Sequence, residues 1–278
     1  MHVQIDAAHV ERTRGRRLVA LSAAATLATV AVAATIVAVG SPNGVEDATA
    51  AFKNAAAVTA ASAERSGIAA VRITHDGELW AGTTIRWNGD DLALSSDTPG
   101  RSGKVGSQLR VVEGTVYGID ERDGGWLAMG SPTNIDPDSG TTPAEHLAAV
   151  REDVGGATLR RLADGMTGLT TRRAGGSTVY TGKAAAGLIA RESGFKEGQA
   201  IRVFPFGFVA NDEAGDPAAL LDTAVTVGAD DVVRQIAVTW GTWSYTVSYR
   251  GLGRTAAPAA PANARSLLEE RRRVRSAG

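Results

Sequence analysis

Residues 238–249 read VTWGTWSYTVSY, and this short stretch decides the fold class, because it holds four of the chain's 14 large aromatic residues. With Gly241-Thr242 as a two-residue turn, Gly first as in a type II′ turn, the flanking residues pair as two antiparallel strands. One face is then apolar and the other polar, and a shift of one residue would mix the two sets. The sequence therefore predicts a hairpin with one buried face. Its predicted pairs are Trp240 with Trp243, Val238 with Tyr245, Ile236 with Val247 and Arg234 with Tyr249 on the apolar face, and Thr239 with Ser244, Ala237 with Thr246 and Gln235 with Ser248 on the polar face.

The same argument predicts further short strands joined by tight turns. Three hairpin turns fall within about fifty residues, a pattern typical of an antiparallel meander. The turn at Asp76-Gly77 pairs Ile73 with Trp80, the turn in 88–91 pairs Trp87 with Leu92 and Ile85 with Leu94, and the turn at 113–114 pairs Val111 with Val116. Further strands are predicted at 126–129, in a hairpin over 167–182 around Gly175-Gly176, at 200–210, and near 222–228, 231–240 and 243–250. In the strand at 200–210, Phe204, Phe206 and Phe208 share one face, and Pro205 on the other indicates an edge strand.

Helices are predicted between these strands. Residues 48–65 are rich in Ala and lack Pro and Gly until Gly67, which favours a helix. A capping box with Pro at the first helical position, at 142–145, predicts a second helix, and shorter ones follow at 157–164 and 184–192. We expect one α+β domain over 48–253, dominated by antiparallel strands.

The N-terminal region indicates the location of the protein. Residues 18–39 carry no charge, and as a helix they would span about 33 Å, enough for the hydrocarbon core of a bilayer. Four Arg residues precede them within 12–17, which predicts that 1–17 are cytoplasmic and the rest extracytoplasmic. This favours an uncleaved transmembrane anchor. The alternative is a cleaved signal peptide, with Ala38 and Gly40 as the small residues before the cleavage site.

Composition and motifs argue against several classes of function. The net charge of −1 implies no nucleic-acid partner, and the absence of Cys excludes disulfides, thiolate metal sites and a lipid-modified Cys. No phosphate-binding loop, dinucleotide fingerprint or nucleophile elbow occurs. The exported His75 and His146 lie apart, so neither a metal site nor His-based catalysis is expected. We expect no enzyme, no cofactor and no catalytic residue.

Two acidic patterns are explained by turns. Asn134, Asp136, Asp138 and Glu145 match EF-hand positions, but Ser139 stands where Gly is required, and Glu145 already belongs to the capping box. The pairs Asp90-Asp91 and Asp230-Asp231 lie at predicted hairpin turns, where adjacent carboxylates point to opposite faces and do not converge on a substrate. No metal site is expected.

The aromatic residues are the remaining signal, and two interpretations stay open. Their rings pack against the predicted helices, or they line an apolar cavity. The candidate ligand-binding residues are Trp80, Trp87, Phe204, Phe206, Phe208, Trp240, Trp243 and Tyr245.

The order of elements, with the final strand ending YTVSYRGLG before a Pro-rich segment, resembles the LolA-like superfamily, in particular the LppX/LprG-type envelope proteins of actinobacteria. The matching residues are Tyr249, Leu252, Gly253 and Pro258. The resemblance implies a curved half-barrel sheet wrapped over helices, with a hydrophobic cavity for acyl chains. Such proteins typically carry a lipobox Cys, which this chain lacks. It assigns no ligand residue.

The expected function is that of a membrane-anchored extracytoplasmic protein that binds a lipid or another apolar ligand. The alternative is a non-catalytic sensor or regulator of envelope stress that acts through a protein partner, with another membrane protein carrying the signal because 1–17 is too short. A leash of about eight residues after the anchor reaches about 15–17 Å, which favours local lipid handling or sensing over long-distance carriage. Residues 254–278 are expected to be a Pro/Ala linker and a disordered basic tail.

Overall fold

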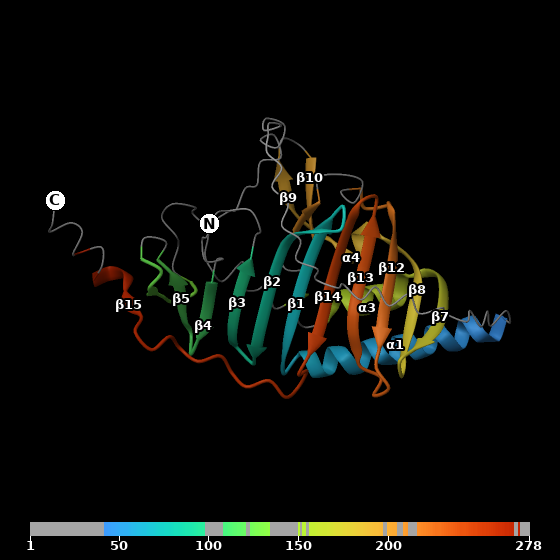
Figure 1. The fold of residues 1–278 in the computed structure, drawn as a ribbon, viewed down its shortest axis with the longest axis horizontal. Coiled ribbons are helices and arrows are strands. Elements are labelled where there is room, and N and C mark those ends of the chain that lie inside the picture. The colour runs from blue at the N-terminus through green and yellow to red at the C-terminus, as the bar shows by residue number, and fades with distance from the viewer. Residues whose placement is uncertain are drawn as a thin grey trace, which may run out of the picture.

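A computed structural model of the chain describes residues 42–97, 108–120, 123–133, 150, 152–153, 156–196, 199–204, 208–210, 216–269 and 272 (Figure 1). In these residues short antiparallel strands dominate, as the spacing of turns predicts. The elements are α1 Pro42–Ala63, β1 Ser66–His75, β2 Glu78–Asn88, β3 Asp91–Asp97, β4 Gln108–Val112, β5 Thr115–Ile119, β6 Trp126–Gly130, α3 Ala157–Gly165, β7 Thr167–Ala174, β8 Ser177–Ala185, α4 Ala186–Ile189, β9 Arg191–Lys196, β10 Gln199–Phe204, β11 Phe208–Ala210, β12 Leu220–Val227, β13 Val233–Trp240, β14 Trp243–Arg250 and β15 Arg265–Ser266.

A large, curved, unclosed sheet forms the body of the molecule. Its twelve strands lie in the order β15-β6-β5-β4-β3-β2-β1-β14-β13-β12-β8-β7, and every neighbouring pair is antiparallel except β15 with β6. The hairpin over 233–250 sits in the middle, because β14 also pairs with β1. β7 and β15 are the two edges. The architecture is the α+β sheet expected from the sequence.

The predicted register is confirmed at most hairpins. In β13–β14, Trp240 is opposite Trp243, Val238 opposite Tyr245 and Ile236 opposite Val247, and the predicted polar pairs also occur. The β2–β3 and β4–β5 pairs are likewise as predicted. Strict alternation of apolar and polar residues leaves only one register that buries a single face.

The predicted pairing of Ile73 with Trp80 is wrong by one residue. Ile73 lies opposite Ala81 and Thr74 opposite Leu79, so the register shifts between them and Trp80 is the extra residue of a β-bulge. A bulge adds a residue to one strand and redirects the side chains beyond it. Counting alternate residues outward from the Asp76-Gly77 turn cannot detect such a bulge.

The single strand predicted for 200–210 is also wrong. β10 and β11 are separate strands that pair with each other, with Phe204 opposite Phe208, and β9 completes a small three-stranded sheet. Pro205 and Gly207 separate β10 from β11 in sequence, and both residue types favour chain reversal. Phe206 lies outside the described residues.

Helix α1 crosses the apolar face of the sheet from β8 toward β2 (Figure 1). Phe52 stacks on Tyr180 of β8 with ring centroids 5.2 Å apart, and the indole Nε1 of Trp87 in β2 donates to the carbonyl oxygen of Ala63 at 2.6 Å. The helix is Ala-rich, so its backbone can approach its neighbours closely. Gly156, before α3, needs this closeness, because a Cβ there would lie 2.8 Å from the Cβ of Ala60. The buried small residues of α1 are Ala55, Ala56, Ala60 and Ala63.

Thr59 joins α1 to the sheet through a buried hydroxyl group. Its Oγ1 donates to the carbonyl oxygen of Ala55 at 2.6 Å and accepts from the backbone N–H of Val233 at 2.8 Å. Thr59→Val keeps the shape but leaves that N–H unpaired, so we expect it to lower the free energy of unfolding by about 1–3 kcal/mol. Urea denaturation checks this. Thr59→Ser, which keeps the hydroxyl group, should cost clearly less, and equal costs would contradict this role.

The segment after Arg254, expected to be a disordered linker, instead follows the sheet as an ordered strap over 254–269. Asn88 donates to the carbonyl oxygen of Thr255 at 2.7 Å, and Arg110 donates to that of Ala259 at 2.9 Å. At its end β15 adds to the edge strand β6, and Arg265 pairs with the buried carboxylate of Asp120 at 3.2 Å. Side chains of the sheet thus hold a segment whose own composition predicts no structure.

At the N-terminal side, the described residues begin with helix α1. α1 begins at Pro42, earlier than predicted. Within the described part of the chain no helix is long and apolar enough to cross a membrane. The predicted anchor at 18–39 and the capping box at 142–145 lie outside the described residues.

Candidate functional site

Three of the eight candidate aromatic residues belong to the packed core. Trp87, Trp240 and Tyr245 lie on the face of the sheet that carries the helices, and Tyr245 is only 1% exposed. The ring of Trp87 also covers Gly67, where a Cβ would lie 2.5 Å from the ring. Trp87 also donates a hydrogen bond to the carbonyl oxygen of Ala63 in α1, so its surroundings are those of a core packed on a helix.

Trp80 and Trp243 differ, because they are half-buried at one end of the same face. Trp243 stacks on Trp240 with ring centroids 6.4 Å apart, and Trp80 meets it edge-on at 5.6 Å. His75 stacks on the Trp243 ring at 4.3 Å. The tips of the β1–β2 and β13–β14 hairpins meet here, where the N–H of Asp76 donates to the carbonyl oxygen of Thr242. We call His75, Trp80, Trp240 and Trp243 the aromatic cluster.

Sequence reasoning missed His75 as part of this cluster. His75 lies opposite Trp243 because β1 pairs with β14. These strands are more than 160 residues apart in the chain, and no turn links them, so their pairing could not be read from a local pattern. Besides its stacking on Trp243, His75 places its Nε2 atom 3.7 Å from a carboxylate oxygen of Asp76.

The three phenylalanines proposed for the site lie apart from it in sequence and topology. Phe204 and Phe208 belong to the three-stranded sheet of β9, β10 and β11, which does not pair with the large sheet. The single strand on which their selection rested is in fact two paired strands, with Phe204 directly opposite Phe208. Phe206 lies outside the described residues.

From the aromatic cluster an apolar face continues across the sheet. In β2–β5 alternate residues of each strand are apolar and buried or half-buried, and register places them side by side. Such a continuous apolar surface inside a curved sheet can contact an acyl chain along its length. Its residues are Ile85, Trp87, Leu92, Leu94, Leu109, Val111 and Val116.

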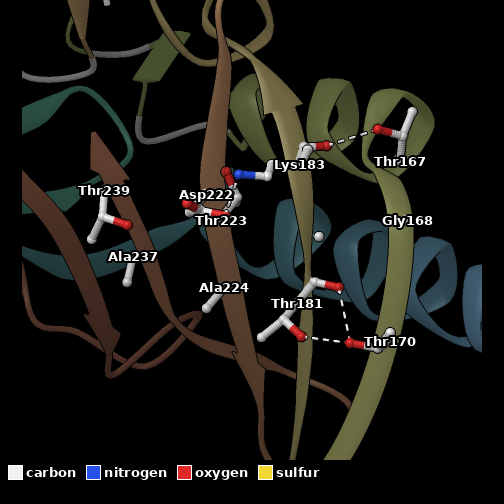
Figure 2. Close-up of a pocket in the computed structure, with 11 residues that line it drawn as sticks. Thr167, Gly168, Thr170, Thr181, Lys183, Asp222, Thr223, Ala224, Ala237 and Thr239 are labelled. Carbon is white, nitrogen blue, oxygen red and sulfur yellow. Dashed lines mark hydrogen bonds and ion pairs between the residues drawn. The ribbon is translucent and has the colours of Figure 1, made fainter. Parts of the chain in front are cut away.

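A groove of about 400 Å³ lies on the opposite face, over β7, β8, β12 and β13 (Figure 2). Thr170 and Thr181 share a hydroxyl–hydroxyl hydrogen bond of 2.7 Å, and Lys183 pairs with Asp222 at 2.7 Å. Hydroxyl groups and an ion pair lose water when an acyl chain covers them, which is unfavourable without new partners. The groove also exposes apolar surface, because its lining includes Gly168, Gly182, Ala224 and Ala237, so its character is mixed. Sequence reasoning missed it, although alternate Thr residues in these strands mark the face as polar.

The core beneath the sheet contains a buried carboxyl group and two buried phenols. Burial raises the pKa of both Tyr245 and Tyr249 above the usual value for Tyr, and the nearby carboxyl group of Asp153 raises the pKa of each further. Asp153 is itself 3% exposed. Both phenols are therefore neutral in the folded protein at physiological pH.

The acidic patterns weighed in the sequence give no metal site among the described residues. No group of three or more potential ligands comes together there. Asp91 accepts a hydrogen bond from the N–H of Glu113, and Asp230 pairs with Arg234, so both predicted pairs serve turns. Asn134, Asp136, Asp138 and Glu145 lie outside the described residues.

No model of a protein family and no curated protein matches the sequence. Solved structures do align with the chain. LprF from Mycobacterium bovis aligns at 11% identity over 78% of this chain and 98% of its own, with a TM-score of 0.49. The Mycobacterium tuberculosis lipoprotein LppX aligns at 16% identity over 79% and 99%, with a TM-score of 0.42. The LolA superfamily protein NE2245 from Nitrosomonas europaea aligns at 8% identity over 77% and 94%, with a TM-score of 0.26.

LppX and a LolA-superfamily protein are thus among the solved structures with which the chain aligns. All three identities are below 20%. The fold itself rests on the strand order and register described above.

Proposed function

We propose that the protein binds a lipid or another apolar ligand at the aromatic cluster, without catalysis. One observation carries the proposal: Trp80 and Trp243 are half-exposed, although they continue an apolar face on which most large side chains, such as Ile85, Trp87 and Leu92, are buried. Large aromatic rings left partly exposed next to a core mark sites where an apolar partner removes them from water. An acyl chain that enters there would meet the apolar face of β1–β5.

We also propose that the protein is held in the cell membrane by residues 18–39, with 1–17 cytoplasmic and the described domain outside. The uncharged 22-residue segment and the Arg residues before it support this proposal. α1 begins at Pro42, so only Gly40 and Ser41 separate it from the predicted anchor. Such a short connection limits the reach of the domain and favours a ligand taken up at the membrane surface.

A binding measurement with matched variants tests the ligand site. The delipidated chain should bind a fluorescent long-chain fatty acid. Replacing both Trp80 and Trp243 by Ala should raise the dissociation constant about tenfold or more, because two aromatic contact surfaces are lost. Titration followed by probe fluorescence gives the constants.

Trp126→Ala is the control. Trp126 lies on the opposite face of the sheet from Val111, where the guanidinium group of Arg110 stacks on its ring at 4.6 Å. This variant should bind the probe like the original chain. Absence of uptake by the delipidated original chain would rule out the proposed function, and equal losses in both variants would rule out the aromatic cluster as the site.

A further inference from the structure

The direction of α1 shows which edge of the sheet lies next to the N-terminal region. Along the helix, Phe52 contacts β8, Thr59 contacts β13, and Ala63 contacts β2. The helix therefore runs from the β7 edge toward the centre of the sheet. In Figure 1 its first turns continue past β7, away from the rest of the sheet.

The length of this overhang gives the distance between β7 and the start of α1. Ten residues lead from Pro42 to Phe52, which is about 15 Å along a helix at about 1.5 Å per residue. Two residues, Gly40 and Ser41, stand between the predicted anchor and Pro42. β7 lies one strand beyond β8 on the side of the overhang, so about 10 Å separates β7 from Pro42 at the start of the helix, given a spacing of about 4.8 Å between strands.

The tip of the β7–β8 hairpin carries unpaired positive charge. Arg172 and Arg173 are exposed, and neither makes an ion pair within the part of the chain that the structure describes. By contrast, Lys53 of α1 is paired with Asp164 at 3.0 Å. Glu46 and Asp47 are exposed in the second turn of α1. The electrostatic attraction between Arg172 or Arg173 and a lipid phosphate group acts over about one Debye length, which is about 8–10 Å.

We propose that the β7 edge faces the bilayer and that Arg172 and Arg173 contact the headgroups of anionic lipids. The opposite edge, with β6 and β15, then lies farthest from the membrane. The strands, which cross α1 (Figure 1), then run along the membrane surface. The proposal rests on the anchor of the proposed function and is independent of the ligand.

The lack of Cys allows single spin labels on the full chain. Ser177→Cys labels the tip of the β7–β8 hairpin, and Asn263→Cys labels the strap beside the far edge. In nanodiscs that contain anionic lipid and a nickel-chelating lipid, nickel should relax the label at 177 at least about threefold more than the label at 263, since about 50 Å of sheet separates them. Equal relaxation, stronger relaxation at 263, or failure of the full chain to remain in the nanodiscs would overturn the proposal.

Charge variants test the lipid contact itself. In the chain labelled at 177, replacing phosphatidylcholine by phosphatidylglycerol should increase nickel relaxation. The change Arg172→Gln with Arg173→Gln should abolish that increase. Arg72→Gln with Arg86→Gln, two exposed residues on the outer face of the sheet centre, should retain it. Retention of the increase by both pairs would overturn the headgroup contact. Fatty-acid uptake is measured separately, so loss of ligand binding does not alter either result.

Discussion

Trp87→Ala should lower the free energy of unfolding by about 3–5 kcal/mol, a loss expected when a buried Trp is truncated in a core. The side chain is 3% exposed and lies on the apolar face of β2. Its ring fills the space above Gly67, and its Nε1 is the donor to the carbonyl oxygen of Ala63 near the end of α1. The substitution removes both a large packed volume and the hydrogen bond that joins helix to sheet. Urea denaturation monitored by circular dichroism measures the loss.

Two further variants separate the packing from the hydrogen bond. Trp87→Phe keeps most of the apolar contact but leaves the Ala63 carbonyl group without this donor, so it should cost about 1–3 kcal/mol. Gly67→Ala keeps the donor and forces a methyl group against the ring, for which overpacking costs of about 1–3 kcal/mol are typical. If Trp87→Ala lowers the free energy of unfolding by less than Trp87→Phe does, the indole ring does not fill the core but lies in an empty cavity.

The local pairing of strands could be predicted from the sequence because it depends on short-range alternation. Trp240 with Trp243 and Trp87 with Leu92 follow from a turn and a period of two residues. The bulge at Trp80 could not be predicted, since an extra residue disturbs alternation without a sequence signature of its own. The reversal between Phe204 and Phe208 did have a signal, in Pro205 and Gly207, which the alternation of the Phe residues masked.

Long-range contacts set the limit of the prediction. The pairing of β1 with β14 brings His75 onto Trp243, and the strap is ordered by partners more than a hundred residues away, such as Asn88 and Asp120. Neither contact has a local pattern. The candidate site was predicted as a set of aromatic residues, but which rings are buried and which are half-exposed depends on where α1 crosses the sheet.

The aromatic residues differ in how they lie relative to α1. Near Ala63 the helix lies over Trp87, which is buried. Trp80 and Trp243 lie at the hairpin tips and remain half-exposed. A ligand at the aromatic cluster would therefore extend the core rather than replace part of it.

The chain should lose stability steeply above about pH 10 because of Tyr245 and Tyr249. Burial raises the pKa of both phenols above the usual value near 10, so they stay protonated in the folded state while they ionise in the unfolded state. Between the unfolded and the folded pKa values the unfolded state binds fewer protons, so the free energy of unfolding falls as the pH rises. Each Tyr contributes a slope of about 1.4 kcal/mol per pH unit in that range, and below about pH 10 the contribution is fully retained.

The double variant Tyr245→Phe with Tyr249→Phe removes both titrating groups and should flatten this fall. Urea denaturation at intervals between about pH 9 and pH 11.5 measures the two slopes, which should differ by up to twice the contribution of one Tyr. Tyr117→Phe, at a half-buried position, is the control, and its slope should follow the original chain more closely. Asp153→Asn removes a carboxyl group that disfavours both phenolates, so it should lower the pKa of each phenol in the folded state. The free energy of unfolding should then stop falling at a lower pH than in the original chain. If the slope in the double variant equals that of the original chain, the two phenols ionise in the folded protein as they do in the unfolded chain. That result would contradict the prediction.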